Sequence, residues 1–419
     1  MKERSLWRDR DFRLVLGGQS VSAFGDAVTF TALPLMVVAL TGSGVAMGTV
    51  GVLQTLPDLF FGLPAGALAD RWDRRRIIIW ADLGRALLTA LIPLSYLVGW
   101  PTLAVILLVT FPMNCLRVLF LAAWTSMIPA LVGRDQVGRA SSYTEAVFSL
   151  SFIIGPAIAG LLVATIGPGP TLLIDATTFV VSATTMRFVQ RRLRADRSGT
   201  ETHLGRDIAE GLRYLVHEPT LRVAVGFAGL VSVTTAPLTA AAIFFLTIDR
   251  GASSDVVGLI LATFGVGYLA GALLAGRLTR GRLGRLMLVA NGVSAVAMVG
   301  FALVESPVVQ AAMTFLAGAC QALWLIPYIT LRSTITPDPL LGRVSAAART
   351  ISIGLQPVGL LLGGLALDAF GGSATIVGMA VLAAIVSGVF SFSATLRSAR
   401  APRGPGHVTL PPPAEAATG

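Results

Sequence analysis

Hydrophobic residues along this chain gather in long blocks that are separated by short polar segments. A helix rises about 1.5 Å per residue, so about 20 apolar residues cross a hydrocarbon core of ~30 Å. Strands of a membrane barrel would instead alternate apolar and polar residues over about 10 positions. The pattern therefore predicts twelve membrane-spanning helices, at residues 14–40, 44–68, 77–98, 102–124, 140–166, 171–189, 221–248, 256–278, 286–304, 308–331, 344–367 and 374–393.

The twelve predicted helices divide into two sets of six that are related in sequence. The motif Gly138-Arg139-Ala-Ser recurs in the second set as Gly342-Arg343-Val-Ser, and a cysteine follows a Thr-Phe pair in the fourth helix of each set. The chain thus resembles a duplicated half. We expect an all-α polytopic membrane protein of two pseudo-symmetric six-helix bundles, at residues 1–189 and 220–395.

A polar linker joins the two predicted bundles, and a second polar segment follows them. Apolar residues recur at helical spacing within the linker, at residues 190–219, which predicts an amphipathic helix on the cytoplasmic side. The tail at residues 396–419 is rich in Pro and Ala and predicts disorder.

Positive charge falls almost entirely in alternate loops. Arg residues precede the first helix and fill the even-numbered loops, whereas the odd-numbered loops carry almost none, with Arg250 as the exception. By the positive-inside rule, both termini face the cytoplasm of a multi-pass protein of the cytoplasmic membrane. The net charge of +10 is therefore an orientation signal, and nucleic acid is not an expected partner. A composition of 54% hydrophobic and 13% charged residues is typical of an integral membrane protein.

The loop after the second helix carries a longer pattern, Gly66-x-x-x-Asp70-Arg71-x-x-Arg74-Arg75-Arg76. With the two sets of six helices and the basic middle loop, it resembles the major facilitator superfamily of transporters. The N-terminal pattern is similar to the branch of macrolide-efflux and enterobactin-exporter proteins, a resemblance carried by Gly25-Asp26, Ala32-Leu-Pro34, Leu56-Pro57, Asp70-Arg71-Trp-Asp-Arg and Asp82-Leu-Gly-Arg85.

The resemblance implies that this loop acts as a conformational latch. Gly66, Asp70, Arg71, Arg74 and Arg75 would hold the two halves together on the cytoplasmic side and favour the outward-facing state. The chain departs from the usual motif at Asp73, where the family has Gly, and Arg280 stands where the second copy would repeat the acid. A simpler interpretation is that the loop only fixes the topology.

A second family pattern lies in the fifth predicted helix. Exporters of the superfamily often carry a glycine series there, and this chain has Gly155, Pro156 and Gly160 at the matching positions. Small residues allow close contact between helices, and a proline bends a helix. The pattern favours export, although helix packing alone would also explain it.

Charged side chains inside the first six helices are the candidates for proton binding. A carboxylate near the middle of a spanning helix costs roughly 2.5–3.5 kcal/mol on insertion scales, so such groups usually line a cavity or serve in a relay. We expect Asp26 to bind the proton, with Asp58 or Arg117 as modulators, unless Asp26 is only a hydrogen-bond acceptor. Asp82 and Arg85 lie on one helical face and predict a structural ion pair. The remaining charges are Glu145 and Asp175.

The second half offers uncharged polar and aromatic groups inside its predicted helices. We expect Gln321, Trp324, Tyr328 and Gln356 to line a cavity for an amphiphilic substrate, with ordinary packing as the alternative for the two aromatic residues. The expected division of roles is proton binding in the first half, while the polar and aromatic groups of the second half help to form the substrate cavity.

The residue inventory narrows the energy source. Lys2 is the single lysine, so the chain has no Gly-x-x-x-x-Gly-Lys phosphate loop for ATP. The three histidines lie in the predicted linker and tail, which leaves carboxylates as proton carriers. No cofactor, metal site or disulfide is expected, and no motif indicates an enzyme.

The sequence thus predicts a secondary transporter that exports hydrophobic or amphiphilic small molecules in exchange for protons. Its expected partners are that substrate, protons and the lipid bilayer, and the oligomeric state is open. The alternatives are a dedicated exporter of one siderophore or secondary metabolite and a non-transporting sensor on a transporter fold.

Overall fold

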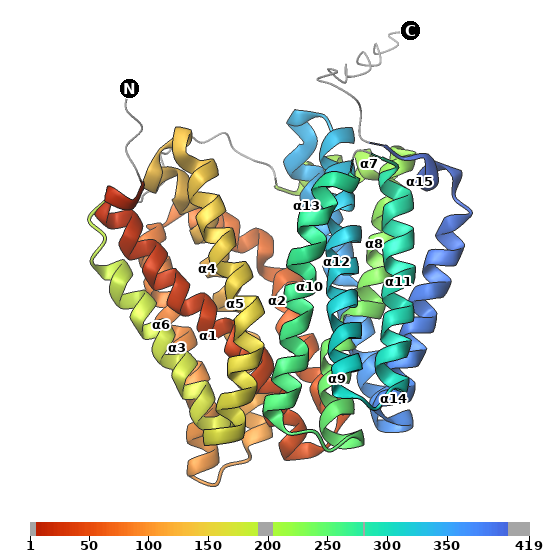
Figure 1. The fold of residues 1–419 in the computed structure, drawn as a ribbon. Coiled ribbons are helices and arrows are strands. Elements are labelled where there is room, and N and C mark those ends of the chain that lie inside the picture. The colour runs from red at the N-terminus through yellow and green to blue at the C-terminus, as the bar shows by residue number, and fades with distance from the viewer. Residues whose placement is uncertain (1–5, 192–203, 280, 401–419) are drawn as a thin grey trace.

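The computed structural model describes residues 6–191, 204–279 and 281–400, and nearly all of them lie in helices (Figure 1). The first half of the chain forms six long helices joined by short turns. Two single-turn helices accompany them, η1 (Leu6–Arg8) and η2 (Arg134–Gln136). The six long helices are α1 (Arg10–Thr41), α2 (Gly44–Arg71), α3 (Arg74–Leu97), α4 (Thr102–Val132), α5 (Val137–Ile166) and α6 (Pro168–Arg187).

The second half repeats this arrangement with more interrupted helices. Its elements are α8 (Pro219–Thr235), α9 (Leu238–Phe244), η3 (Phe245–Asp249), α10 (Ser254–Leu278), α11 (Leu283–Leu303), α12 (Pro307–Ile335), η4 (Asp338–Leu340), α13 (Leu341–Gly354), α14 (Gln356–Ser391) and α15 (Ala394–Ser398).

Each of the twelve predicted spans corresponds to helix in the described chain, with two breaks inside the spans that the hydrophobic pattern does not reveal. The seventh span is divided at Pro237 into α8 and α9, and ends in the π-helical turn η3. The eleventh begins as α13 and continues as the first part of α14. Within α14, Gly371 has φ +79°, a conformation that favours glycine, and there the eleventh span ends and the twelfth begins.

By length and apolar composition, ten helical segments of the described residues could span a membrane. One of them, Asp338–Ser391, contains the break at Gly371 and therefore comprises two spans. Helix α6 is not among the ten, but it packs along both α1 and α3 within the first bundle.

The linker contributes one helix to the described structure, α7 (Leu204–His217), which packs against α13. Glu210 forms an ion pair with Arg343 of α13 at 2.5 Å, and the Tyr214 hydroxyl donates to the Ile335 carbonyl at 3.2 Å. The predicted tail, residues 401–419 and part of the linker, residues 192–203, lie outside the described residues.

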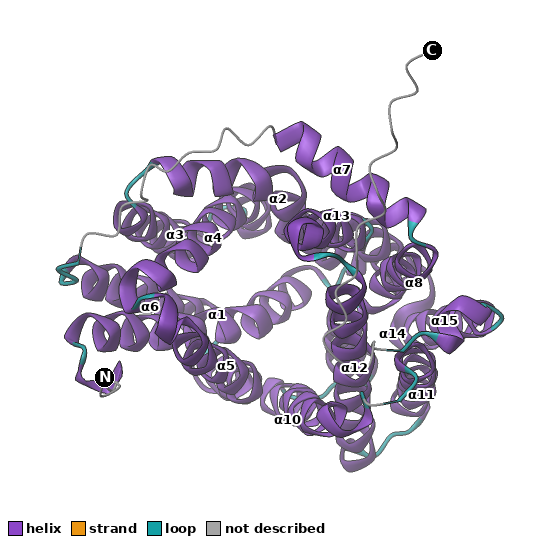
Figure 2. Ribbon diagram, turned by 90° about the horizontal axis from the view of Figure 1, so that it is seen from above, coloured by secondary structure: helices purple, strands orange, loops and turns teal. Residues whose placement is uncertain are grey.

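The two halves touch on one side of the molecule and separate on the other. The start of α1, α7 and α15 lie at the top of Figure 1, which we call the α7 side, and the opposite end is the far side. Toward the α7 side the two bundles diverge (Figure 1). Viewed from above, α5 lies beside α10, and α2 beside α13 (Figure 2).

The hydrophobic core has the same asymmetry. One cluster of buried residues joins the halves, since it contains Leu33 and Met36 of α1 together with Phe245 and Phe301 of the second half. Toward the α7 side the core is divided into separate clusters, one around Trp124 in the first half and one around Trp324 in the second. The halves are therefore packed together on the far side.

Glycines permit the closest of these contacts between halves. A Cβ on Gly160 of α5 would lie 2.8 Å from the Cα of Gly258 of α10. A Cβ on Gly364 of α14 would lie 3.2 Å from the Cα of Gly48 of α2. Such approaches exclude larger side chains, as is typical of interfaces between membrane helices.

The outer surface of the bundles carries many large apolar side chains that face no other part of the described chain. Trp80, Leu108, Leu273 and Val308 are among the most exposed. Exposed apolar surface on this scale fits a lipid environment and not water. The structure is thus a multi-pass membrane protein.

Candidate functional site

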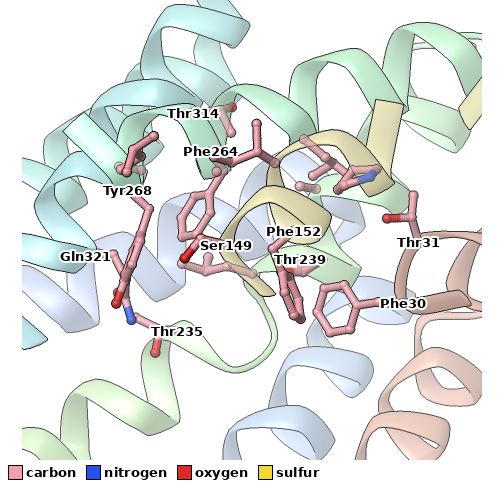
Figure 3. A pocket seen from close by; sticks show the side chains of 18 of the residues that line it. Phe30, Thr31, Ser149, Phe152, Thr235, Thr239, Phe264, Tyr268, Thr314 and Gln321 are labelled. Atoms are coloured by element: carbon pink, nitrogen blue, oxygen red, sulfur yellow. The ribbon is translucent and has the colours of Figure 1, made fainter. Parts of the chain in front are cut away.

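A cavity with a volume of about 600 Å³ lies between the two halves. It is lined from the first half by α1 and α5 and from the second by α8 to α12. Aromatic side chains dominate its wall, and Figure 3 shows Phe30 and Phe152 on one side with Phe264 and Tyr268 on the other. We call it the aromatic cavity. Such a wall suits a flat or bulky apolar ligand.

Among the residues that the structure describes, Glu145 of α5 is the one charged residue that lines the aromatic cavity. Within the described residues its carboxylate has no ion pair or hydrogen bond. An unpaired carboxylate among aromatic rings attracts a cation, because the rings also present negative charge on their faces. The sequence identifies Glu145 as a charged residue of a predicted helix but does not predict a role for it.

A buried charged cluster lies inside the first bundle. The Arg85 guanidinium of α3 forms a close ion pair with Asp26 of α1 and a longer one with Asp82, at 3.8 Å. It also lies over the Phe179 ring, with 4.0 Å between the guanidinium carbon and the ring centroid. The Arg85 side chain is 4% exposed, whereas that of Asp26 is 33% exposed. Asp26 is thus the more exposed partner of this ion pair.

Asp175 of α6 extends this cluster on its other side. The Thr29 hydroxyl donates to one carboxylate oxygen at 2.6 Å, and the Thr178 hydroxyl to the other at 3.0 Å. The predicted pair of Asp82 and Arg85 is therefore part of a larger group in which Asp26 is the nearer partner of Arg85.

Asp58 and Arg117 form a second ion pair, between α2 and α4. The Arg117 side chain also donates to Asn114 at 3.0 Å. Arg349 of α13 approaches the other oxygen of Asp58 at 3.5 Å, so this carboxylate connects the two halves. Asp26 and Asp58 consequently have different arginine partners, and Arg117 contacts Asp58 and not Asp26.

The four predicted cavity residues of the second half have different locations. Gln321 lines the aromatic cavity, and Tyr328 lines a separate cavity nearer the α7 side. Trp324 lines neither of these cavities; its indole is buried against Phe227, and its N–H donates to Gln321 at 2.8 Å. Gln356 begins α14 and also lies outside both cavities.

The glycine series of α5 lies at helix contacts. A Cβ on Gly155 would lie 2.5 Å from the Ala27 side chain of α1, and Gly160 faces Gly258 of α10. Pro156 lines the aromatic cavity. The motif therefore joins the first bundle internally and also joins the two halves.

The loop between α2 and α3 contacts its own half. Asp73 caps α3 by accepting from the Arg75 amide at 3.0 Å, and the Arg75 guanidinium donates to the carbonyls of Met186 and Arg187 at the end of α6. A Cβ added to Gly66 would have no neighbouring atom within 4 Å, and the Arg71 side chain is exposed. The Asp70 side chain lies outside the described part of the structure, so the latch stays a prediction.

Asp368 of α14 joins the halves on the far side, a contact that the sequence does not predict. Its carboxylate accepts from the Ser43 hydroxyl at 2.8 Å, from the Gly44 amide and from the Val45 amide at 3.1 Å. These groups form the N-terminus of α2, where the helix dipole favours negative charge. We call this contact the far-side clasp. The sequence signal that could have indicated this contact is an acidic residue one position beyond the predicted eleventh span.

Comparison with known proteins agrees with this architecture. The family model described as transmembrane secretion effector matches residues 5–414. The multidrug efflux pump Tap of Mycolicibacterium fortuitum is 28% identical over 393 residues, which are 92% of this chain and 96% of Tap. Tap of Mycobacterium tuberculosis is 30% identical over 387 residues, 88% of this chain and 90% of that protein. Macrolide efflux protein A of Streptococcus pyogenes is 25% identical over 386 residues, which are 88% of this chain and 92% of that protein.

Solved structures of transporters share the fold at lower identity. A bacterial homologue of the human lysosomal transporter Spinster, inward-facing and unoccupied, has a TM-score of 0.74 at 15% identity and covers 95% of this chain and 98% of its own. The nucleoside transporter NupG has a TM-score of 0.72 at 16% identity, and the match covers 91% of this chain and 98% of NupG. The chain therefore belongs to the transmembrane secretion effector family of the major facilitator superfamily.

Proposed function

We propose that this transporter exports amphiphilic, drug-like molecules across the cytoplasmic membrane in exchange for protons. The observation that carries the proposal is the aromatic cavity, which lies between the halves and contains a single, unpaired carboxylate. The names of Tap and macrolide efflux protein A, which describe efflux pumps for drugs, support the same direction of transport.

The distribution of arginine supports a cytoplasmic location for the α7 side. The basic loops and both ends of the described chain lie there, as the positive-inside rule requires. In this orientation the structure is inward-facing, because its halves diverge toward the cytoplasm. Substrate would then enter the aromatic cavity from the cytoplasm or from the inner leaflet.

Transport would proceed by rocking of the two halves about the aromatic cavity. The far-side contacts of α2 with α14 and of α5 with α10 would open, while the α7 side would close. The segment from Gly66 to Arg76, which comprises the end of α2, a short turn and the start of α3, would then act as the latch of the outward-facing state. The far-side clasp at Asp368 would hold the inward-facing state.

Proton coupling would use the Asp26 cluster. When Asp26 is charged it pairs with Arg85, and a proton on Asp26 would abolish that attraction and free the guanidinium to interact with Asp82. A change of hydration around Asp26 between the two states would alter its proton affinity. Asp58 would play a modulating role, since its ion pairs join α2 to α4 and to α13.

Glu145→Gln is expected to impair export of cationic substrates selectively. The carboxylate is the one charge in the aromatic cavity, and an attraction of about 1–3 kcal/mol corresponds to roughly 5- to 150-fold in affinity. Export of an uncharged substrate of similar size should change little. Efflux of a fluorescent cation and of a neutral dye from cells expressing each variant measures the difference.

Glu305→Gln is the matched control for this experiment. It makes the same change of charge at an exposed carboxylate that pairs with Arg250 outside the aromatic cavity. If Glu145→Gln reduced efflux of both dyes equally, or of neither, Glu145 would not be the cation-binding group.

A further inference from the structure

A second cavity, of about 660 Å³, lies between the halves nearer the α7 side. It is lined by α2 and α4 from the first half and by α12 and α13 from the second. Leu325 and Tyr328 on α12 line this cavity, one and two turns beyond Gln321 of the aromatic cavity. We call it the basic cavity.

Positive charge exceeds negative charge around the basic cavity. Its charged lining residues are Asp58, Arg332 and Arg349. Asp58 already forms a close pair with Arg117, and its 3.5 Å contact with Arg349 is a second, looser one. Among the described residues, Arg117 and Arg349 thus share one carboxylate, and Arg332 adds a third guanidinium group. Uncompensated charge is expensive inside a membrane protein, so the excess favours a bound anion.

Arg332 has no carboxylate partner among the described residues. Its guanidinium lies over the Tyr328 ring, with 5.4 Å between the guanidinium carbon and the ring centroid. Arg349 is 65% exposed on its side chain, so its guanidinium is free to move toward a ligand. Both residues present donors of the kind that bind oxyanions in pairs.

The wall of the basic cavity also holds unused hydrogen-bonding capacity. The Tyr328 hydroxyl, the Arg332 Nε and the Ser352 hydroxyl are each buried without a hydrogen-bond partner among the described residues. All three residues line this cavity. Buried polar groups are nearly always paired, so three unpaired groups on one wall indicate a missing partner.

We propose that the basic cavity binds an oxyanion, of the phosphate or carboxylate class, between Arg332 and Arg349. The ligand group comes either from the head of an anionic phospholipid or from a soluble anion. It balances the excess charge and draws Arg349 away from Asp58. Because the aromatic cavity is not involved, the site is independent of which substrate the protein exports.

The experiment measures binding of two probes to purified full-length protein. Native mass spectrometry of protein reconstituted in phosphatidylcholine with added phosphatidylglycerol measures retained anionic lipid. Calorimetry with inorganic phosphate, on delipidated protein in a neutral detergent, measures binding of a soluble anion. Each is repeated on Arg349→Gln, Arg332→Gln and the double variant.

Arg277→Gln is the matched control, since Arg277 is an exposed arginine at the end of α10 and lies outside the basic cavity. The wild type and this control should bind at least one probe, and the double variant should bind it at least about tenfold more weakly. Because Arg349 is mostly exposed, Arg349→Gln alone tests the site if the double variant fails to fold.

Retention of lipid without binding of phosphate identifies a headgroup, and binding of phosphate identifies a soluble ligand. Failure of the wild type to bind either probe would overturn the proposal. The proposal would also be overturned if Arg349→Gln and any folded Arg332→Gln protein bound the probe as tightly as the wild type. It would be overturned likewise if the control Arg277→Gln lost as much affinity for the probe as the variants of the cavity. None of these outcomes depends on drug transport, so a failure here is distinct from a failure of the proposed function.

Discussion

Asp26→Asn is expected to abolish proton-driven transport. Each proton that crosses a potential of 100 mV supplies ~2.3 kcal/mol, equivalent to ~50-fold accumulation of an uncharged substrate, and a pH gradient supplies the driving force for a cationic one. Asn cannot bind or release that proton, so the accumulation should fall to the level reached by equilibration alone. Substrate binding should persist, because Asp26 does not line the aromatic cavity.

The variant must be separated from a folding defect, since Arg85 is buried and loses its nearest partner. Breaking a buried ion pair from one side destabilises proteins by ~3–5 kcal/mol. Arg85 must be kept in this test, because its removal would leave the buried Asp82 carboxylate without its ion-pair partner. The yield and the size-exclusion profile of purified Asp26→Asn protein therefore serve to detect a folding defect. Undiminished coupled transport by Asp26→Asn, measured in proteoliposomes, would remove Asp26 from the mechanism.

Asp368→Ala is expected to release the far side and populate an outward-open state. The substitution removes three hydrogen bonds and the negative charge at the N-terminus of α2. The loss of capping and of the dipole interaction amounts to ~2 kcal/mol, which shifts a two-state population by roughly 30-fold. The fraction with separated far ends should rise accordingly.

The measurement is the distance between spin labels at Trp100 and Phe370, which lie at the far ends of the first and second halves. The native Cys115 and Cys320 are first replaced by Ala. Glu305→Gln serves as control, because its ion pair with Arg250 stays within the second half. An unchanged distance distribution in Asp368→Ala would mean that the clasp does not bias the two states.

The sequence could predict the spans because their hydrophobicity reports directly on the bilayer. The break at Pro237 was not predictable from hydrophobicity, since this residue lies in apolar surroundings that are typical of a continuous helix. The far-side clasp was missed for a related reason. The predicted eleventh span ended at Leu367, so Asp368 fell in a turn, where an acid needs no explanation.

Partners of the charged residues were only partly predictable, because they depend on how helices are rotated against one another. Spacing alone placed Asp82 beside Arg85, but the closer contact of Arg85 is with Asp26 on a different helix. Similarly, Gln321 and Trp324 are three residues apart, yet only Gln321 lines the aromatic cavity. Helix α12 is apolar around much of its circumference, so the sequence does not indicate which of its faces lines the aromatic cavity.

The most direct test of proton-coupled export is accumulation of a permanently charged fluorescent cation, ethidium, in proteoliposomes with an acidic lumen. Protons leaving the lumen should drive the dye inward in vesicles of either protein orientation, whereas protein-free vesicles should take up none. We predict accumulation above equilibrium that a protonophore abolishes and that Asp26→Asn lacks. Equal dye uptake with and without the gradient would contradict the account.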